Sequence, residues 1–214
     1  MIKIENLYKS YNSRKNFFSR GKQEKIFNGL SVEIPLNKMS AIIGVNGAGK
    51  TTLFKILSGY TSFDSVGELT IGKLSHTEYL KNNKIFLISS EDRSFYYRLT
   101  LVQNLLFFTN IFKVEVSEKE IIEKLEFLGI AHKKDHFYYE LSTGMKQRLS
   151  LARALLIKPN MLILDEMERG IDTQMVEKIF DYLDTIKKEI TIIYATHQKY
   201  LIDKADVVIE LKNE

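Results

Sequence analysis

Three groups of residues have types and spacings that could do chemistry, and the first is a glycine-rich loop at residues 44–52. Its sequence, GVNGAGKTT, has two glycines separated by four residues and followed by a lysine and a hydroxyl residue. This pattern suits a phosphate chain, because glycine lets the backbone bend and approach oxygen atoms closely. Lys50 could reach the β- and γ-phosphates of a nucleoside triphosphate, and the Thr51 hydroxyl could ligate Mg²⁺. We expect nucleotide contacts from Gly44, Asn46, Gly47, Ala48, Gly49, Lys50, Thr51 and Thr52.

The second group is a pair of carboxylates, Asp165 and Glu166, directly after the apolar run at residues 161–164. The run predicts a buried strand, and ligands of open parallel sheets bind at the carboxyl ends of the strands. We therefore expect Asp165 to hold Mg²⁺, through water, and Glu166 to orient or deprotonate an attacking water. Adjacent acids are common on surfaces, but the four apolar residues before this pair favour a site.

The third group is LSTGM at residues 141–145, which opens a predicted helix. Ser142 is a good N-cap residue, and Gly144 permits another group to approach the helix end closely. A helix N-terminus favours anions, because its backbone N–H groups are free and its dipole is positive. On its own, however, this segment indicates only a capped helix.

Tyr11 offers an aromatic face on which an adenine could stack, although a core tyrosine is the alternative. The segment that follows, residues 12–26, has five basic residues against one acidic residue. This difference equals the formal net charge of +4 of the whole chain, so a generally basic surface for nucleic acid is not expected. The segment is either a hairpin connection or, because it also holds Phe17 and Phe18, a contact to anionic lipid or a partner.

The composition is that of a globular protein, with 44% hydrophobic and 27% charged residues in 214. The chain has no cysteine, which excludes disulfides, thiol chemistry and zinc-finger sites. No uninterrupted run of about 18 apolar residues is present, so we expect no membrane span. If the protein works at a membrane, another chain must supply the span.

Strands and helices are expected to alternate along most of the chain. The loop joins the apolar run at residues 39–43 to a helix, and helical periodicity dominates residues 99–159. We predict one α/β domain over residues 1–214, with a P-loop NTPase core, a mostly parallel sheet and an N-terminal antiparallel β subdomain. A helical subdomain is inserted at about residues 92–159. Further strands are expected at residues 2–8, 28–34, 68–71, 84–88, 161–164, 191–194 and 207–211, and a helix at residues 172–188.

The segment LSTGM resembles the Leu-Ser-Gly-Gly-Gln signature of ATP-binding-cassette (ABC) ATPases, and it lies in the family's usual place before the acidic strand. Residues 170–172, GID, are similar to the dimer loop that follows the acidic pair, and His197 is similar to the switch histidine. The resemblance covers essentially the whole chain in the family's order. Thr143 and Met145 replace a glycine and a glutamine of the signature, and Met167 replaces a common proline.

The resemblance implies a dimer that holds two ATP molecules between its subunits. Ser142 and Gly144 would contact the γ-phosphate of ATP bound to the other subunit, and Asp172 would lie in the dimer loop. His197 would bridge the γ-phosphate and the interface, with a structural histidine as the alternative. Catalysis would then rest on Lys50, Glu166 and His197.

The family also has a glutamine loop, and here residues 88–92, ISSED, occupy its place. Gln103 belongs to the following helix and is not that glutamine. The candidates to replace it are Glu91 and Ser90, and we favour Glu91 as a Mg²⁺ ligand because carboxylate is a good ligand for a hard cation.

The family resemblance implies the ATPase subunit of an ABC transporter, working with integral membrane permease subunits on the cytoplasmic inner face of the cell membrane. The dimer would be a homodimer or a heterodimer with another ABC ATPase, and no nucleic acid is expected. Residues 90–100 look similar to ATPases of bacterial export-type (ABC-2-like) systems, so export is expected. Part of the aromatic group Phe95, Tyr96 and Tyr97 would accept a permease helix, unless the helical subdomain buries it. The alternative function is a soluble, non-transport ABC ATPase in assembly or as a scaffold.

Overall fold

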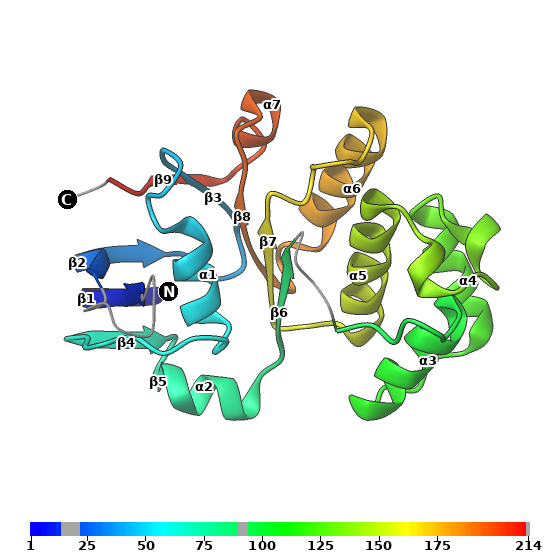
Figure 1. Ribbon diagram of the computed structural model, residues 1–214, viewed down its shortest axis with the longest axis horizontal. Coiled ribbons are helices and arrows are strands. Elements are labelled where there is room, and N and C mark those ends of the chain that lie inside the picture. The colour runs from blue at the N-terminus through cyan, green and yellow to red at the C-terminus, as the bar shows by residue number, and fades with distance from the viewer. Residues whose placement is uncertain (14–21, 90–93, 213–214) are drawn as a thin grey trace.

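A computed structural model describes residues 1–13, 22–89 and 94–212, and its strands form two sheets (Figure 1). The larger sheet has the order β6-β7-β8-β3-β9, and every neighbouring pair in it is parallel. This confirms the predicted α/β fold with a mostly parallel sheet. Its strands are β3 (Met39–Ile43), β6 (Ile85–Ser89), β7 (Met161–Asp165), β8 (Thr191–Ala195) and β9 (Val207–Glu210).

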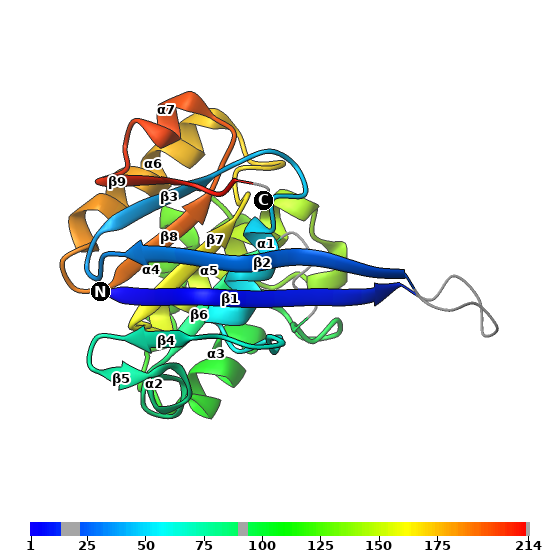
Figure 2. The same ribbon diagram turned by 90° about the vertical axis from the view of Figure 1, so that its left-hand side faces the viewer.

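The smaller sheet is antiparallel, with the order β2-β1-β4-β5. Its strands are β1 (Ile2–Ser13), β2 (Lys22–Ile34), β4 (Glu68–Ile71) and β5 (Leu74–Ser75). β1 and β2 lie side by side and extend past the rest of the molecule (Figure 2). They are longer than predicted, because the polar stretch at residues 9–13 shows no apolar alternation, yet pairing with β2 satisfies its backbone. The basic segment is therefore partly strand, and its residues 14–21 lie outside the description.

Helices fill the segment between β6 and β7. They are α3 (Leu101–Ile111), α4 (Glu118–Phe127), two short 3₁₀ turns (Ala131–Lys133 and Tyr138–Glu140) and α5 (Thr143–Ile157). α5 contacts β6 on one side, and α3 and α4 pack on its other side, away from the sheets (Figure 1). The predicted periodic sets are buried at Leu101, Leu105, Ile121, Leu125 and Leu128.

The remaining helices are α1 (Lys50–Leu57), α2 (His76–Asn82), α6 (Thr173–Ile186) and α7 (Lys199–Ile202). α2 and α7 were not predicted, because both are short and have little apolar periodicity. A signal for α2 exists in the sequence: the Ser75 and Glu78 side chains form a reciprocal capping box. Among the helices within the described ranges, none combines the length and apolar character needed to cross a bilayer.

The register of the parallel sheet explains why distant motifs meet. Asp165, the last residue of β7, pairs with Ser89 of β6 and with Ala195 of β8, and Ala195 pairs with Ile42 of β3. These four residues form one row at the carboxyl edge of the sheet. The segments that leave this row include the glycine-rich loop, the acidic pair and the residues leading to His197.

Candidate functional site

The glycine-rich loop joins β3 to α1, as predicted, and its shape depends on glycine at specific positions. Gly49 has φ +90, and a Cβ there would lie 2.5 Å from the Phe27 ring. Gly47 has φ +87, but a Cβ there would meet no atom within 4 Å. Gly49 is thus required by both conformation and packing, whereas the space beside Gly47 is open to a ligand.

The first turn of α1 is suited to an anion. Its N-cap is Gly49, which provides no side-chain cap, and the turn itself, fully within the described part, has no acidic residue. Its backbone N–H groups therefore have no side-chain acceptor there, and the helix dipole is not neutralised by a carboxylate. Lys50 is only 7% exposed, and its Nζ donates to the carbonyl oxygens of Gly44 at 2.7 Å and Val45 at 3.2 Å.

A cavity of about 240 Å³ opens beside this loop. Its lining combines two glycines, a lysine and two threonines with a single glutamate, a set that fits a phosphate chain with a bound cation. The lining consists of Ile26, Asn46, Gly47, Gly49, Lys50, Thr51, Thr52 and Glu166.

Thr51 and Asp165 form the part of the site that could hold a metal. The Thr51 hydroxyl donates a 2.7 Å hydrogen bond to Asp165 Oδ2. Burial raises the pKa of Asp165 above its ordinary value, the charge of Glu166 adds to this rise, and the hydrogen bond from Thr51 opposes it. A hydroxyl oxygen beside a partly buried carboxylate oxygen is a donor set that Mg²⁺ prefers.

The Glu166 carboxylate is engaged at both of its oxygens. Oε1 lies 3.2 Å from Nε2 of His197, and Oε2 lies 2.5 Å from a guanidinium nitrogen of Arg169. The backbone of Glu166 has φ +50, a conformation that is rare outside glycine and found at functional sites. The structure therefore brings together Glu166 and His197, which the sequence singled out separately, because β7 and β8 are neighbours.

The signature segment lies at the start of α5, where Ser142 caps the helix by accepting a hydrogen bond from the Met145 N–H at 3.3 Å. The group that approaches Gly144 closely is the carbonyl of Gly170, and a Cβ at position 144 would overlap it. Asp172 caps α6 by accepting a 2.9 Å hydrogen bond from the Met175 N–H. Within the described part of one chain, neither Ser142 nor Gly144 belongs to the lining of the phosphate-loop cavity.

Another predicted site residue, Tyr11, stands apart from this cluster. Tyr11 is 39% exposed on β1, with Nζ of Lys9 at 4.7 Å from its ring centre, so it is not a core tyrosine. It does not line the cavity among the described residues.

Glu91 and Ser90 lie outside the described residues. Gln103 lies in the first turn of α3 and forms a capping box with Thr100, as expected of a helical residue.

Sequence reasoning missed the residues that hold the loop after the acidic pair. Arg169 pairs with Glu166, and the Thr196 hydroxyl donates a 2.5 Å hydrogen bond to Glu168 Oε1. The Gln147 amide is 2% exposed, and with its nitrogen facing the loop it donates to the carbonyl oxygens of Met167 and Arg169. In the sequence, Glu168 and Arg169 are separated from the acidic pair only by Met167, but this pattern does not distinguish them from solvated charged residues.

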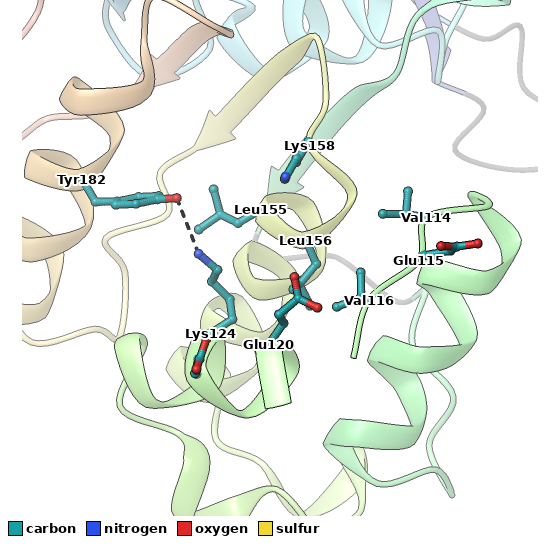
Figure 3. Close-up of a pocket in the computed structure, with 10 residues that line it drawn as sticks. Val114, Glu115, Val116, Glu120, Lys124, Leu155, Leu156, Lys158 and Tyr182 are labelled. Atoms are coloured by element: carbon teal, nitrogen blue, oxygen red, sulfur yellow. Dashed lines mark hydrogen bonds between the residues drawn. The ribbon is translucent and has the colours of Figure 1, made fainter. Parts of the chain in front are cut away.

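A second hollow, of about 260 Å³, lies between α4, α6 and the end of α5 (Figure 3). Lys124 points across it toward Tyr182, with 3.5 Å between Nζ and the phenol oxygen. Three glutamates and two lysines line it, so it lacks the positive character that a phosphate chain needs. The phosphate-loop cavity is the better candidate for a nucleotide.

Comparisons with known proteins agree with this geometry. The family model described as ABC transporter matches residues 27–168. The lantibiotic transport ATP-binding protein SrtF of Streptococcus pyogenes is 33% identical over 199 residues, which cover 92% of this chain and 80% of that protein. The linearmycin resistance ATP-binding protein LnrL of Bacillus subtilis is 29% identical over 219 residues, which cover 97% of this chain and 66% of that protein. The methionine import ATP-binding protein MetN of Campylobacter jejuni is 29% identical over 224 residues, which cover 92% of this chain and 63% of that protein.

Solved structures share the fold. A dimeric ATP-binding cassette in a post-hydrolysis state with ADP and Pi superposes with a TM-score of 0.83 at 21% identity, covering 99% of this chain and 94% of that one. An ATP-bound bacterial Atm1-family ABC exporter superposes with a TM-score of 0.78 at 22% identity. The match covers 99% of this chain and 36% of that one. With the phosphate loop, the acidic pair and His197 at one edge of the sheet, the chain belongs to the ABC transporter family, as an ATP-hydrolysing, ATP-binding chain.

Proposed function

We propose that this chain is the ATPase subunit of a membrane transporter and that it drives export through a separate permease. The main support for the proposal is that Thr51, Asp165 and Glu166 lie together beside the phosphate-loop cavity. Relatives named for lantibiotic transport and linearmycin resistance favour export. A methionine import protein is similarly related, so the direction of transport is part of the proposal.

In the proposed site, Lys50 and the N–H groups at the start of α1 bind the phosphate chain. The Lys50 ammonium would exchange its two carbonyl acceptors for phosphate oxygens. Thr51 and Asp165 would hold Mg²⁺, which when bound neutralises charge on the phosphates. A further ligand from Glu91, or from Ser90, is part of the proposal, and Tyr11 would stack on the adenine.

Glu166 is the group proposed to orient or deprotonate the attacking water. It lines the cavity at the carboxyl edge of the sheet, and His197 lies within hydrogen-bonding distance of its Oε1. A positioned carboxylate of this kind contributes roughly 10²–10⁴-fold to a rate. His197 would hold this carboxylate and reach toward the terminal phosphate.

Two such chains, or one with another ABC ATPase, would complete each site. Ser142 and Gly144 stand at the N-terminus of α5, a 15-residue helix without an acidic residue in its first turn, all within the described part. That helix end can therefore receive the terminal phosphate of ATP bound to the partner cassette. Asp172 lies in the adjoining loop, which would face the same interface.

The permease would dock on an exposed aromatic surface of the helical part, made by Tyr96, Tyr97, Phe137 and Tyr139, with the partly buried Phe107 beneath Tyr96. Tyr96 and Tyr97 are 49% and 55% exposed, whereas Phe95 is buried, so the predicted aromatic group divides between surface and core. Tyr96 packs edge-on against Phe107 at 4.6 Å, and the rings of Phe137 and Tyr139 stack at 5.7 Å.

The loop that presents these tyrosines is held by a buried amide. Asn104 is fully buried; it accepts a hydrogen bond from the Tyr96 N–H and donates to the carbonyl oxygens of Tyr96, Leu99 and Thr100. A fixed aromatic surface of this kind suits the apolar face of a helix from a membrane protein. The chain would then sit on the inner face of the membrane through its partner.

Membrane fractionation tests the transporter proposal. The chain is expressed alone and together with a candidate permease, a polytopic membrane protein from a neighbouring gene. We expect the chain to sediment with membranes only in the second case. Equal sedimentation in both cases, or none in either, would contradict the proposal and favour a non-transport ABC ATPase.

A further inference from the structure

Arg169 has a position that the catalytic scheme above does not use. Its guanidinium group lies 2.5 Å from Glu166 Oε2, on the carboxylate oxygen opposite the one that faces His197. The Arg169 side chain is 66% exposed, while that of Glu166 is 18% exposed. Arg169 therefore reaches from the surface to the carboxylate that the proposed reaction needs.

This ion pair fixes where the carboxylate points. A charge-assisted hydrogen bond from a guanidinium group is short and directional, and here it acts together with the contact to His197 on the other oxygen. Because both oxygens are held, any reorientation of the Glu166 carboxylate would lengthen at least one of these two contacts. The pair thus restrains the proposed base while the loop keeps its present shape.

The backbone of Arg169 is in turn held by the signature helix. With its amide nitrogen turned toward the loop, the orientation that satisfies its hydrogen bonding, Gln147 of α5 donates to the Arg169 carbonyl oxygen at 2.5 Å and to that of Met167 at 3.3 Å. One residue further along, the Gly170 carbonyl packs against Gly144 so closely that no side chain fits there. Because these groups are closely packed, a displacement of the N-terminus of α5 would also displace the loop that contains Arg169.

We propose that Arg169 is a positioning residue that restrains Glu166 in the isolated chain and releases it when the start of α5 engages a second nucleotide. The inference rests on the proposed function, because it takes Glu166 as the group that acts on water. Arg169 acts only through Glu166 and touches no substrate in this scheme. Its removal should therefore change turnover without changing ATP binding.

The test measures kcat and KM for MgATP on the purified full-length chain in the absence of a permease. Arg169→Ala should raise kcat roughly two- to fivefold, the range that a partly exposed ion pair supports, with KM unchanged. Arg169→Lys, which keeps a cation at this position, should return kcat toward the wild-type value. Lys119→Ala, on the exposed face of α4, removes a positive charge far from the site and should leave both constants unchanged.

An unchanged kcat in Arg169→Ala would overturn the inference, and so would a lower kcat, which would mean that Arg169 orients Glu166 for the reaction instead of restraining it. A change confined to KM would overturn it as well. Failure of the proposed function has a different signature: the wild-type chain would not hydrolyse MgATP, or Glu166→Gln would hydrolyse it at the wild-type rate.

Discussion

The Thr51 hydroxyl and the Asp165 carboxylate are joined by a 2.7 Å hydrogen bond, although 114 positions separate them in the chain. One belongs to the first turn of α1 and the other to the end of β7, and the parallel sheet brings the two segments together. Because both oxygens suit Mg²⁺, this contact marks the metal end of the proposed site.

Thr51→Ala should raise the Mg²⁺ concentration needed for half-maximal ATP turnover, since it removes one of the proposed oxygen ligands. Thr51→Ser keeps the hydroxyl and is the matched control, with a Mg²⁺ requirement close to that of the wild type. The measurement is a Mg²⁺ titration of ATPase activity at saturating ATP. The same requirement in all three proteins would contradict a metal role for Thr51.

Gly144→Ala should lower turnover by at least about tenfold while ATP binding to the isolated chain is retained. The added Cβ would push against the Gly170 carbonyl and displace the start of α5, whereas the phosphate-loop cavity is lined by other described residues. Fluorescent-ATP binding and ATPase assays on the same preparation separate the two effects. Wild-type turnover in Gly144→Ala would show that the close contact has no part in the reaction.

The double substitution Tyr96→Ser and Tyr97→Ser should abolish sedimentation with the co-expressed permease. Both side chains are about half exposed, so the free energy of unfolding should change by less than about 1 kcal/mol. Phe95→Ala is the contrasting variant: its ring is 3% exposed and stacks on Tyr138 at 5.0 Å, and its loss should cost about 3–5 kcal/mol. Retained sedimentation of the double variant would remove this surface from the proposal.

Asp206 provides a pH prediction for the fold. Its burial tends to raise its pKa, but hydrogen bonds from Lys187 and from the Met39 N–H outweigh this and lower the pKa below the ordinary value of 3.8. A carboxyl group whose pKa is lowered in the folded state stabilises the fold at pH values above its ordinary pKa. This contribution is lost as the pH falls through the lowered, folded-state pKa. Asp206→Asn should therefore destabilise the protein by about 1–3 kcal/mol at pH 7 and by less at pH 3. Denaturant unfolding at both pH values measures this, and an equal loss at both would be the contrary result.

Much of the site could be predicted because each motif lies at the end of a strand. The phosphate loop, Asp165 and His197 follow apolar runs, and the order of parallel strands places such ends at one edge. Arg169 could not be predicted, because an arginine after an acidic pair has the same local pattern as a solvated residue. Its role depends on a turn in which Glu166 adopts positive φ, which hydropathy does not report.

The fold, like the site, could be predicted from the sequence only in part. The strands of the parallel sheet were predicted to within a residue or two at each end, since they are short apolar runs. The outer halves of β1 and β2 were missed, because a polar strand is specified by its hydrogen-bonding partner and not by burial. Gly144 was predicted to allow a close approach, but only the structure identifies Gly170 of the same chain as the group that approaches.

Glu166 is proposed to act on the attacking water at an ATP site formed by this chain, and steady-state ATP hydrolysis by Glu166→Gln measures this role. The amide keeps the shape of the side chain but cannot accept the proton. We expect ATP binding to be retained and turnover to fall by roughly 10²-fold or more, with MgATP holding the variant as a dimer in size-exclusion chromatography. A monomeric variant that hydrolyses MgATP at the wild-type rate would contradict the account.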